Sequence, residues 1–275
     1  MTTVAQALAA ARRRLPANEA RLLLGHVLAR PAEWLLAHDD EAVAGEALRS
    51  FAALAARRAA GEPVAYLVGH REFHGRDFAV SPAVLIPRPE TELLVERALA
   101  IVEPDVPAAV LDLGTGSGCI AITLACERPS ARVAAADIAP AALAVAEANA
   151  QRHGANVRFV ASDWFAALGG ELFDLVVANP PYVALGDPHL TAGDLRYEPG
   201  SALASGIDGL DSIRAIIEAA PGHLVDGGWL LLEHGYDQAK AVRSLLECAG
   251  FAHIGQWRDL AGIVRVSGGR STFGR

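Results

Sequence analysis

The sequence predicts an α/β protein in which a small all-helical region precedes a doubly wound, mostly parallel sheet. Three observations predict it. The first residues, up to about 60, carry helical apolar stripes with no strand pattern between them. From about residue 107 onward, short apolar runs typical of buried strands alternate with stretches typical of helices. A glycine-rich loop follows the first of those runs, where open α/β sheets bind ligands.

The composition is that of a globular protein with ample core, since 52% of the 275 residues are hydrophobic and 20% are charged. A net charge of −8 argues against a broad nucleic-acid interface, which draws its affinity from clustered Lys and Arg. Lys240 is the single lysine, so no loop ends in the Gly-Lys-Ser/Thr of a P-loop. We therefore expect no direct contact with nucleic acid and no phosphoryl transfer of that type.

The sequence shows no signal for membrane insertion, export or metal binding. No uncharged apolar run approaches the ~20 residues that cross a bilayer. Arg12 to Arg14 follow the first apolar stretch rather than precede it, contrary to a secretory signal. The three cysteines have no paired spacing for zinc or a redox dithiol. We expect a cytoplasmic protein without a metal site or a membrane contact.

Residues 1–68 are predicted to form the helical domain. Asn18 is a plausible N-cap for a helix that Pro31 ends. The apolar stripes of the domain are Ala20, Leu23, Leu24 and Val27, then Leu48, Phe51 and Ala55. A protein-recognition role stays open beside a plain core role for these stripes. Residues 69–88 turn to Gly, Pro and aromatic residues around His74-Gly75, which predicts a hairpin connector.

Residues 89–275 are predicted to form the sheet domain. Seven strands are expected, at residues 108–113, 132–136, 157–160, 172–178, 228–232, 254–257 and 262–266. Helices are expected through Thr123 and Cys126 and at residues 140–152, 209–220 and 237–248. The alternation favours parallel strands joined by helices, and the last two short strands favour an antiparallel hairpin.

The stretch Asn179-Pro180-Pro181-Tyr182 follows the fourth expected strand, which two prolines forbid from continuing. Asn179 offers a side-chain carbonyl, Pro180 a backbone carbonyl without a competing N–H, and Tyr182 a flat face with a hydroxyl. Two carbonyl acceptors can take both hydrogens of a planar NH2 group and leave its nitrogen facing an electrophile. An ordinary strand-ending turn is the alternative interpretation.

The glycine-rich loop after the first strand suits a ligand with an amino-acid end. Gly114, Gly116 and Gly118 fall as G-x-G-x-G, whereas the dinucleotide fingerprint is G-x-G-x-x-G. Small residues let the backbone approach a ligand at the helix N-terminus. Asp112, immediately before the loop, also favours an amino-acid end over a diphosphate.

The next two strands end in residues that suit adenosine. Asp137 ends the second strand, where a carboxylate can accept both ribose hydroxyls. Asp163 and Trp164 end the third, where they can bond and stack an adenine ring. An N-cap role for Asp137 and a core role for Trp164 are the alternatives. Adenosine carrying an amino acid in place of a diphosphate is S-adenosylmethionine.

The turn from Pro87 to Glu92 precedes a helix that begins near Leu93. Pro89, Glu90 and Glu92 suit the positive end of a helix, but Arg88 does not follow from helix-start chemistry. A ligand-facing role of this turn therefore stays open beside a structural one.

These stretches together resemble the release-factor glutamine methyltransferases, the PrmC/HemK family, over nearly the whole chain. Asn-Pro-Pro-Tyr is shared with many amino-methylating enzymes, whereas Ile-Pro-Arg-Pro-Glu-Thr-Glu is far more specific to this family. The resemblance rests on Gly61-Glu62-Pro63-Val64-Ala65-Tyr66, Glu72-Phe73, Val84 to Glu92, the glycine loop, Asn179 to Tyr182 and Tyr197-Glu198-Pro199. It implies a seven-stranded Rossmann-like class I methyltransferase domain, with the helical domain helping to hold the substrate.

The resemblance also implies the reaction: transfer of methyl from S-adenosylmethionine to the side-chain amide nitrogen of the glutamine in the Gly-Gly-Gln loop of peptide-chain release factors. It implies cofactor contacts from Gly114, Thr115, Gly116, Ser117, Gly118, Asp137, Ile138, Asp163, Trp164 and Asn179. It implies substrate contacts from Asn179, Pro180, Pro181, Tyr182, Arg88, Glu90 and Thr91, with catalytic roles for Asn179, Pro180 and Tyr182. We expect a monomer.

One departure from the family pattern is Glu233-His234-Gly235, where the family has Glu-Leu-Gly, and it leaves any role of His234 open. Three alternatives also stay open. An exocyclic adenine NH2 on DNA or RNA fits the Asn-Pro-Pro-Tyr motif nearly as well, although the net charge disfavours it. A nicotinamide dehydrogenase and a catalytically idle binding module are the other two.

Overall fold

The computed structural model describes residues 1–272 and divides the chain into two compact units. Unit 1 comprises Met1–His70 and Gly193–Tyr197, and unit 2 comprises Arg71–Ala192 and the chain from Glu198 onward. The last three residues of the predicted sheet domain lie outside the described residues. The boundaries expected at residues 68 and 88 stay predictions. The sequence pattern did not indicate that residues 193–197 join the first unit.

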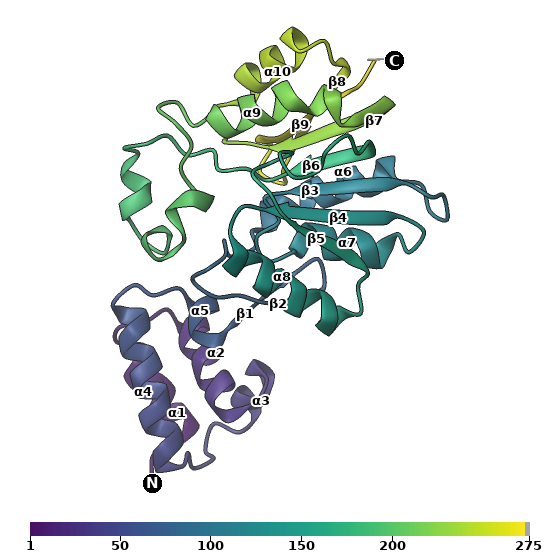
Figure 1. Ribbon diagram of the computed structural model, residues 1–275. Helices are drawn as coiled ribbons and strands as arrows, with labels where there is room; N and C mark the ends of the chain where they lie inside the picture. The colour runs from purple at the N-terminus through teal and green to yellow at the C-terminus, as the bar shows by residue number, and fades with distance from the viewer. Residues whose placement is uncertain (273–275) are drawn as a thin grey trace. The chain divides into compact units, whose positions relative to one another are not determined.

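Unit 1 is helical (Figure 1). Its helices are α1 (Val4–Ala11), α2 (Ala17–Leu28), α3 (Ala32–Ala37), α4 (Gly45–Ala59) and α5 (Val64–Val68). Leu23, Leu24 and Phe51 lie in its buried core, as their helical spacing predicted. The predicted N-cap was wrong: α2 begins at Ala17 after Pro16, which lacks the N–H that a helix start leaves unpaired. Pro31 precedes α3, three residues after α2 ends.

A two-stranded hairpin comprises β1 (His70–Phe73) and β2 (Arg76–Ala79), joined by the turn His74-Gly75. Apart from His70, it belongs to unit 2. A 3-10 turn at Pro89–Thr91 leads into α6 (Glu92–Ile101). The helices that follow are α7 (Cys119–Glu127), α8 (Pro140–His153), α9 (Asp211–Ala219) and α10 (Ala239–Cys248). The strands of the large sheet are β3 (Ala109–Leu113), β4 (Arg132–Asp137), β5 (Val157–Ala161), β6 (Phe173–Ala178), β7 (Leu224–Glu233), β8 (Ala252–Arg258) and β9 (Val264–Arg270).

The seven strands form one sheet in the order β5-β4-β3-β6-β7-β9-β8. Strands β5 to β7 pair in parallel, and β9 pairs antiparallel with both β7 and β8 in the C-terminal hairpin. This confirms the predicted architecture. Residues on the two faces alternate with the period of a strand. Leu111 packs with Ile213 of α9 and Leu246 of α10 on one face. Val110 packs with Leu94 of α6 and Ile122 of α7 on the other, and Figure 1 shows both layers.

Three strands extend two or more residues beyond their predicted bounds. β7 begins at Leu224 rather than near Gly228, β8 begins at Ala252 rather than Ile254, and β9 continues to Arg270. Gly227 and Gly228 interrupt the apolar run of β7, and glycine is depleted in strands, so the pattern hid its first half. A Cβ at Gly228 would lie 3.0 Å from the Phe173 carbonyl oxygen, so close backbone approach explains that glycine.

The neighbours β3 and β6 mark the switch point of the sheet, with Leu113 paired to Ala178. The chain places β4 and β5 on one side of β3, and then places β6 and β7 on its other side. The glycine loop leaves β3 and the Asn-Pro-Pro-Tyr stretch leaves β6 at this same edge. Ligands of open α/β sheets bind in the crevice at such a switch point. Within the described part of the chain, no helix is both long and apolar enough to cross a membrane.

Candidate functional site

A cavity of about 380 Å³ lies in unit 2 at the carboxyl ends of β3 to β6. It brings together most of the residues that the sequence marked: Arg88, Thr91, Gly114, Thr115, Gly116, Ser117, Asp137, Ile138, Asp163, Trp164, Asn179 and Pro181. Four marked residues do not line it: Glu90, Gly118, Pro180 and Tyr182. The sequence did not assign a further part of the wall, which consists of Pro199, Ser201, Ala202, Ala204 and Ser212. The first four lie between Asn-Pro-Pro-Tyr and α9, where no strand or helix pattern was found, and Ser212 lies in α9.

The glycines of the loop after β3 differ in what they do. Gly114, Gly116 and Gly118 all have positive φ, at 69°, 55° and 81°, which favours glycine. A Cβ on Gly118 would lie 2.7 Å from Ile122 Cδ1 and 3.1 Å from Ala146 Cβ, so this glycine lets α7 and α8 pack closely. Nothing lies within 4 Å of the Cβ position at Gly116, which lines the cavity.

Asp112 stabilises the glycine loop through hydrogen bonds to Thr115 and to Ala121 of the helix that follows it. It is fully buried at the end of β3, and its Oδ2 accepts hydrogen bonds from the Thr115 hydroxyl at 2.7 Å and the Ala121 amide at 3.2 Å. Its Oδ1 is buried without a hydrogen-bond partner among the described residues. Burial raises the pKa of Asp112 to about 7, against the opposing effect of those two hydrogen bonds.

Asp137, at the end of β4, ties its strand to the glycine loop. Its Oδ2 accepts from the Gly116 amide and its Oδ1 from the Ala139 amide, both at 2.9 Å. A carboxylate has about four lone-pair sites, so each oxygen keeps one for a ligand hydroxyl. The expected alternative of a helix N-cap is not what forms, because Ala139 occupies the cap position of α8.

Trp164 stands at the end of β5 in a strained conformation. Its φ is 46°, a left-handed value that is costly for a bulky residue, by about 1–3 kcal/mol. The Ser162 hydroxyl donates to the Trp164 carbonyl at 2.8 Å and accepts from the Ala167 amide at 3.0 Å, which fixes the turn. The indole lies 3.5 Å from the Cβ position of Gly114, beside the cavity. Strain of this kind at a cavity wall suits a ring held ready to stack on a ligand.

Asn179 is oriented by a neighbour from a distant part of the chain. Its Nδ2 donates to the Thr91 hydroxyl oxygen at 3.1 Å, and Thr91 is itself 2% exposed. The Asn179 carbonyl oxygen is therefore the side of the amide left for a ligand.

Glu233, at the end of β7, is an acceptor for Tyr182 that sequence reasoning did not assign. The Tyr182 hydroxyl donates to Glu233 Oε1 at 3.3 Å, whereas Glu233 Oε2 is buried without a hydrogen-bond partner among the described residues. Burial raises the pKa of Tyr182 well above its usual value. A signal was present: Glu233 closes an apolar strand as Asp137 does.

Arg88 and the turn before it are held by Glu198, whose side chain is fully buried. One oxygen of Glu198 accepts from the Ile86 amide at 3.1 Å, and the other pairs with the Arg88 guanidinium. The Arg88 that helix-start chemistry left unexplained thus has a partner 110 residues later.

His234 is a buried residue whose two ring nitrogens both form hydrogen bonds within the protein. It is fully buried, with Nε2 bonded to the Ser267 hydroxyl at 2.8 Å and Nδ1 to the Gly235 carbonyl at 2.9 Å. Burial lowers its pKa, so the ring is neutral at neutral pH.

The residues fit S-adenosylmethionine. The glycine cradle leaves room at Gly116, Asp137 keeps acceptor capacity, and Trp164 offers a ring face beside them. Among the described residues, no group of three or more His, Cys, Asp or Glu side chains could hold a metal ion.

Comparisons with known proteins place the chain in a family. Residues 1–69 match the PrmC N-terminal domain, and residues 90–194 match the methyltransferase small domain. The chain is 54% identical over 256 residues to the release factor glutamine methyltransferase of Bordetella pertussis, covering 93% of this chain and 95% of that protein. It is 53% identical to that of Xylella fastidiosa, covering 96% of each. The chain belongs to the release factor glutamine methyltransferase family.

Solved structures agree with the fold of this family. A methyltransferase from Pyrococcus furiosus superposes with a TM-score of 0.55 at 19% identity, covering 80% of this chain and 98% of that one. A 16S rRNA N2 G1207 methyltransferase of T. thermophilus, solved with AdoMet and guanosine, gives a TM-score of 0.56 at 22% identity, covering 74% of this chain and 49% of that one. At these identities the likeness concerns the fold alone.

Proposed function

We propose that the chain is an enzyme that transfers methyl from S-adenosylmethionine to the side-chain amide nitrogen of the glutamine in the Gly-Gly-Gln loop of release factors. The observation that carries the proposal is the orientation of Asn179. Its amide NH2 is engaged by Thr91, so its carbonyl oxygen is free to accept an NH2 hydrogen in the cavity that Gly116, Asp137 and Trp164 also line.

The role of the residues around the substrate is to orient its amide nitrogen toward the methyl group. A carboxamide nitrogen is a poor nucleophile because its lone pair is delocalised, as the ~18–20 kcal/mol rotation barrier of a peptide bond indicates. The Asn179 side-chain carbonyl and the Pro180 backbone carbonyl accept the two hydrogens of the substrate NH2, and the Tyr182 ring covers its face. S-adenosylmethionine, when bound, supplies a methyl group on a positively charged sulfur. No general base is assigned, since a methylated amide cation loses its proton readily.

Different parts of the cavity wall bind the cofactor and the substrate. The loop from Gly114 to Ser117, with Asp137, Ile138, Asp163 and Trp164, holds the cofactor. Arg88 and Thr91 close the substrate side, and Pro181 adds to its wall. Gly118 acts by helix packing, and Glu90 has no part in lining the site.

The name of the substrate rests on the family. Relatives that share about half their residues with this chain over nearly their full length are called release factor glutamine methyltransferases. The net charge of −8 favours a protein substrate over a nucleic acid. A monomer in the cytoplasm completes the proposal.

Methyl transfer to a purified release factor tests the proposal directly. The protein is incubated with S-adenosylmethionine carrying a labelled methyl group and with either a release factor or duplex DNA. We expect the label on the release factor, with mass spectrometry showing one added methyl on the Gln of Gly-Gly-Gln. A release factor whose Gln is replaced by Glu is the matched control and should take no label. Label on DNA alone would overturn the proposal in favour of an adenine methyltransferase.

A further inference from the structure

A buried asparagine connects the glycine loop to the end of β2. Asn149 lies in α8 and is fully buried. Its Nδ2 donates to the Ser117 carbonyl at 2.9 Å and to the Ala79 carbonyl at 3.0 Å, and its Oδ1 accepts from the Ala79 amide at 2.8 Å. Both hydrogens of the NH2 group and the carbonyl oxygen of this one side chain are therefore used.

Helical spacing places Asn149 beside the loop. Ala142 of α8 lines the cavity, and Ala146 lies one turn further along, where its Cβ is 3.1 Å from the Cβ position of Gly118. Residues at this spacing share one face of a helix, and Asn149 is the next residue on that face. The face of α8 that packs on the glycine loop thus ends in an amide.

The Ser117 carbonyl belongs to a part of the loop that glycine makes flexible in the unfolded chain. Ser117 lies between Gly116 and Gly118, which both have positive φ, and glycine loses more conformational freedom on folding than any other residue. The Gly118 amide bonds the Thr115 carbonyl at 2.8 Å. The bond from Asn149 fixes the same peptide from its carbonyl side.

This bond also decides which way the Ser117 carbonyl points. Asn149 is fully buried and does not line the cavity, so a carbonyl that bonds it points into the protein. Ser117 itself lines the cavity. A carbonyl that faced the cavity would repel the carboxylate of a ligand with an amino-acid end, whereas backbone N–H groups attract an anion. Asn149 therefore keeps an unfavourable dipole away from the ligand.

The contact with Ala79 reaches another part of the cavity wall. Ala79 ends β2, and the chain that follows it contributes Ala83 to Leu85, Pro87 and Arg88 to the wall. Asn149 bonds both the amide and the carbonyl of Ala79. One side chain thus connects the glycine loop with the chain that leads to Arg88.

We propose that Asn149 is a positioning residue for cofactor binding, which keeps the Ser117 carbonyl turned away from the cavity and fixes the glycine loop to the chain after β2. It acts through the backbone of Ser117. This inference rests on the proposed function in one respect, that the glycine loop binds S-adenosylmethionine. The fixed loop itself follows from the hydrogen bonds alone.

The affinity of Asn149→Asp for S-adenosylmethionine at different pH values tests this role. Asp keeps the shape, but its ionised carboxylate has no hydrogen to donate and faces two carbonyls with a negative charge. We expect calorimetry to show binding weaker by on the order of 10-fold or more at about pH 8.5. The deficit should shrink toward about pH 6, because burial favours protonation and the protonated carboxyl can donate one hydrogen. A merely structural defect would not recover in this way.

Asn156→Asp is the matched control, because it makes the same chemical change at an exposed position outside the cavity. It should bind S-adenosylmethionine like the wild type at both pH values. Affinities are compared with the wild type at the same pH, because other charged and titratable groups surround the contacts of Asn149: Asp77, Asp112, Cys119, Asp137, Arg152 and His153. Wild-type affinity of Asn149→Asp at both pH values, or a deficit that is independent of pH, would overturn the inference.

Hydrogen exchange in the free protein tests the fixed loop without any cofactor. At neutral pH we expect the amides of Gly116 and Gly118 to exchange faster in Asn149→Asp than in the wild type, by on the order of 10-fold. The amides of β6 and β7 should stay protected, which shows that the sheet is folded. Unchanged exchange at Gly116 and Gly118 contradicts the positioning role.

A measurement on the wild type alone decides the case in which Asn149→Asp does not fold. S-adenosylmethionine should slow exchange of the Ala79 amide, although Ala79 does not line the cavity, because Asn149 connects it to the loop. The Gly75 amide is the control, since it bonds Glu72 Oε1 at 2.6 Å in the hairpin turn and should exchange at an unchanged rate. Slower exchange at Gly116 without slower exchange at Ala79 counts against the inference.

The two proposals can fail separately. A wild-type protein that binds S-adenosylmethionine but leaves release factors unmethylated contradicts the proposed function, and the affinities still decide the role of Asn149. A wild-type protein that does not bind S-adenosylmethionine also contradicts the proposed function, and exchange at Gly116 and Gly118 in the free protein then decides whether Asn149 fixes the loop.

Discussion

At the scale of single residues, Asn179 is the group on which the proposed chemistry depends most. Its NH2 group donates to the Thr91 hydroxyl oxygen, which leaves its carbonyl oxygen for the ligand side. We expect Asn179→Ala to lower kcat by on the order of 10²-fold or more, as removal of an oriented hydrogen-bonding group at a reacting centre does. Methyl transfer to a release factor measures this. Asn156→Ala, an exposed asparagine outside the cavity, should retain full turnover, and retained turnover in Asn179→Ala would contradict the assigned role.

Asp112 gives a prediction about stability and pH. Its pKa is raised in the folded protein to about 7 from an ordinary 3.8, so the folded state binds more protons than the unfolded state between those values. The free energy of unfolding should therefore fall as pH rises from about 4 to about 7 and level off above.

Asp112→Asn should make that pH dependence less steep. The asparagine carbonyl can take over the bonds from Thr115 and Ala121, and its NH2 fills the place of the unpaired Oδ1. Urea unfolding at a series of pH values measures the effect. Glu233 contributes a slope of the same sign, so part of the dependence stays. Parallel curves for the two proteins would show that Asp112 does not titrate in this window.

Sequence patterns predicted which residues line the same cavity, but they did not predict the hydrogen-bond partners that orient those residues. Asp137, Trp164 and Asn179 follow strands, and the ends of parallel strands meet at one edge, so their grouping was predictable. The hydrogen bond of Asn179 with Thr91 joins residues 88 positions apart, and that of Tyr182 with Glu233 joins residues 51 positions apart. Such pairing depends on packing in the folded chain, and local patterns carry no trace of it.

At the scale of elements, the turn from Ile86 to Arg88 depends on Glu198. The Ile86 amide and the Arg88 guanidinium both bond this buried carboxylate. Glu198→Ala leaves both donors unpaired, and hydrogen bonds to charged groups contribute about 1.5–3 kcal/mol each. We expect faster hydrogen exchange at the Ile86 amide and weaker binding of S-adenosylmethionine, because Arg88 lines the cavity.

Glu127→Ala is the control for Glu198→Ala. Glu127 pairs with Arg76 at 2.8 Å, but both side chains are partly exposed, and such pairs contribute little. Exchange at Ile86 should then match the wild type. Equal exchange rates in the wild type and Glu198→Ala would show that the turn is held by other contacts.

The elements themselves were largely predictable where their periodicity is strong. Strands β3 to β6 match the prediction within one residue at each end because their runs are mostly apolar and contain no glycine or proline. The prediction was poorer where glycine or proline decides the backbone: β7 starts earlier than its apolar run, and the N-cap of α2 is Pro16 rather than Asn18. Residues 183–210 contain short 3-10 turns but no helix or strand, and no pattern predicted that some of them line the cavity.

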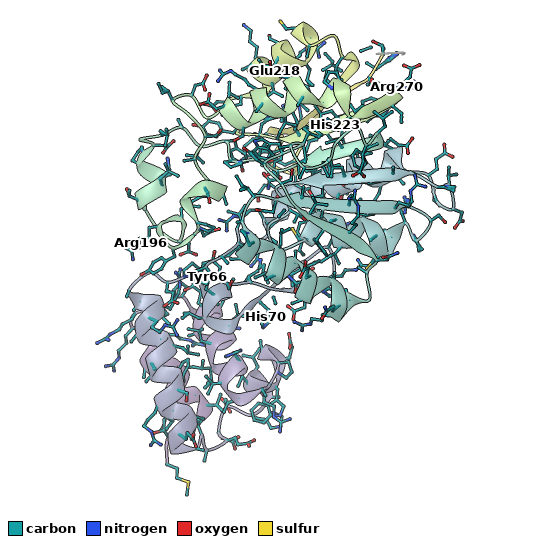
Figure 2. All side chains as sticks on the ribbon, in the orientation of Figure 1. Tyr66, His70, Arg196, Glu218, His223 and Arg270 are labelled. Atoms are coloured by element: carbon teal, nitrogen blue, oxygen red, sulfur yellow. The ribbon has the colours of Figure 1, made fainter. Side chains whose placement is uncertain are left out.

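At the scale of the whole molecule, residues 193–197 of the later part of the chain belong to the helical unit. Arg58 of α4 bonds Glu19 of α2 at 2.7 and 3.0 Å and Asp194 at 2.7 Å, with 17% of its side chain exposed. These partners raise its pKa further above the usual value. Arg196, labelled in Figure 2, donates to the Ala60 carbonyl, as does the Tyr197 hydroxyl at 3.0 Å.

Replacing Arg58 should release this segment from the helical unit. Arg58→Ala removes the charge that two carboxylates share, so we expect faster trypsin cleavage after Arg196 and a loss of about 1–3 kcal/mol in the free energy of unfolding. Arg57→Ala is the matched control one residue away, since the Arg57 side chain is 54% exposed and, among the described residues, pairs with Glu62 alone. It should cleave and unfold like the wild type, because exposed pairs contribute little. Equal cleavage after Arg196 in the two variants would mean that Ala60, rather than Arg58, holds the segment.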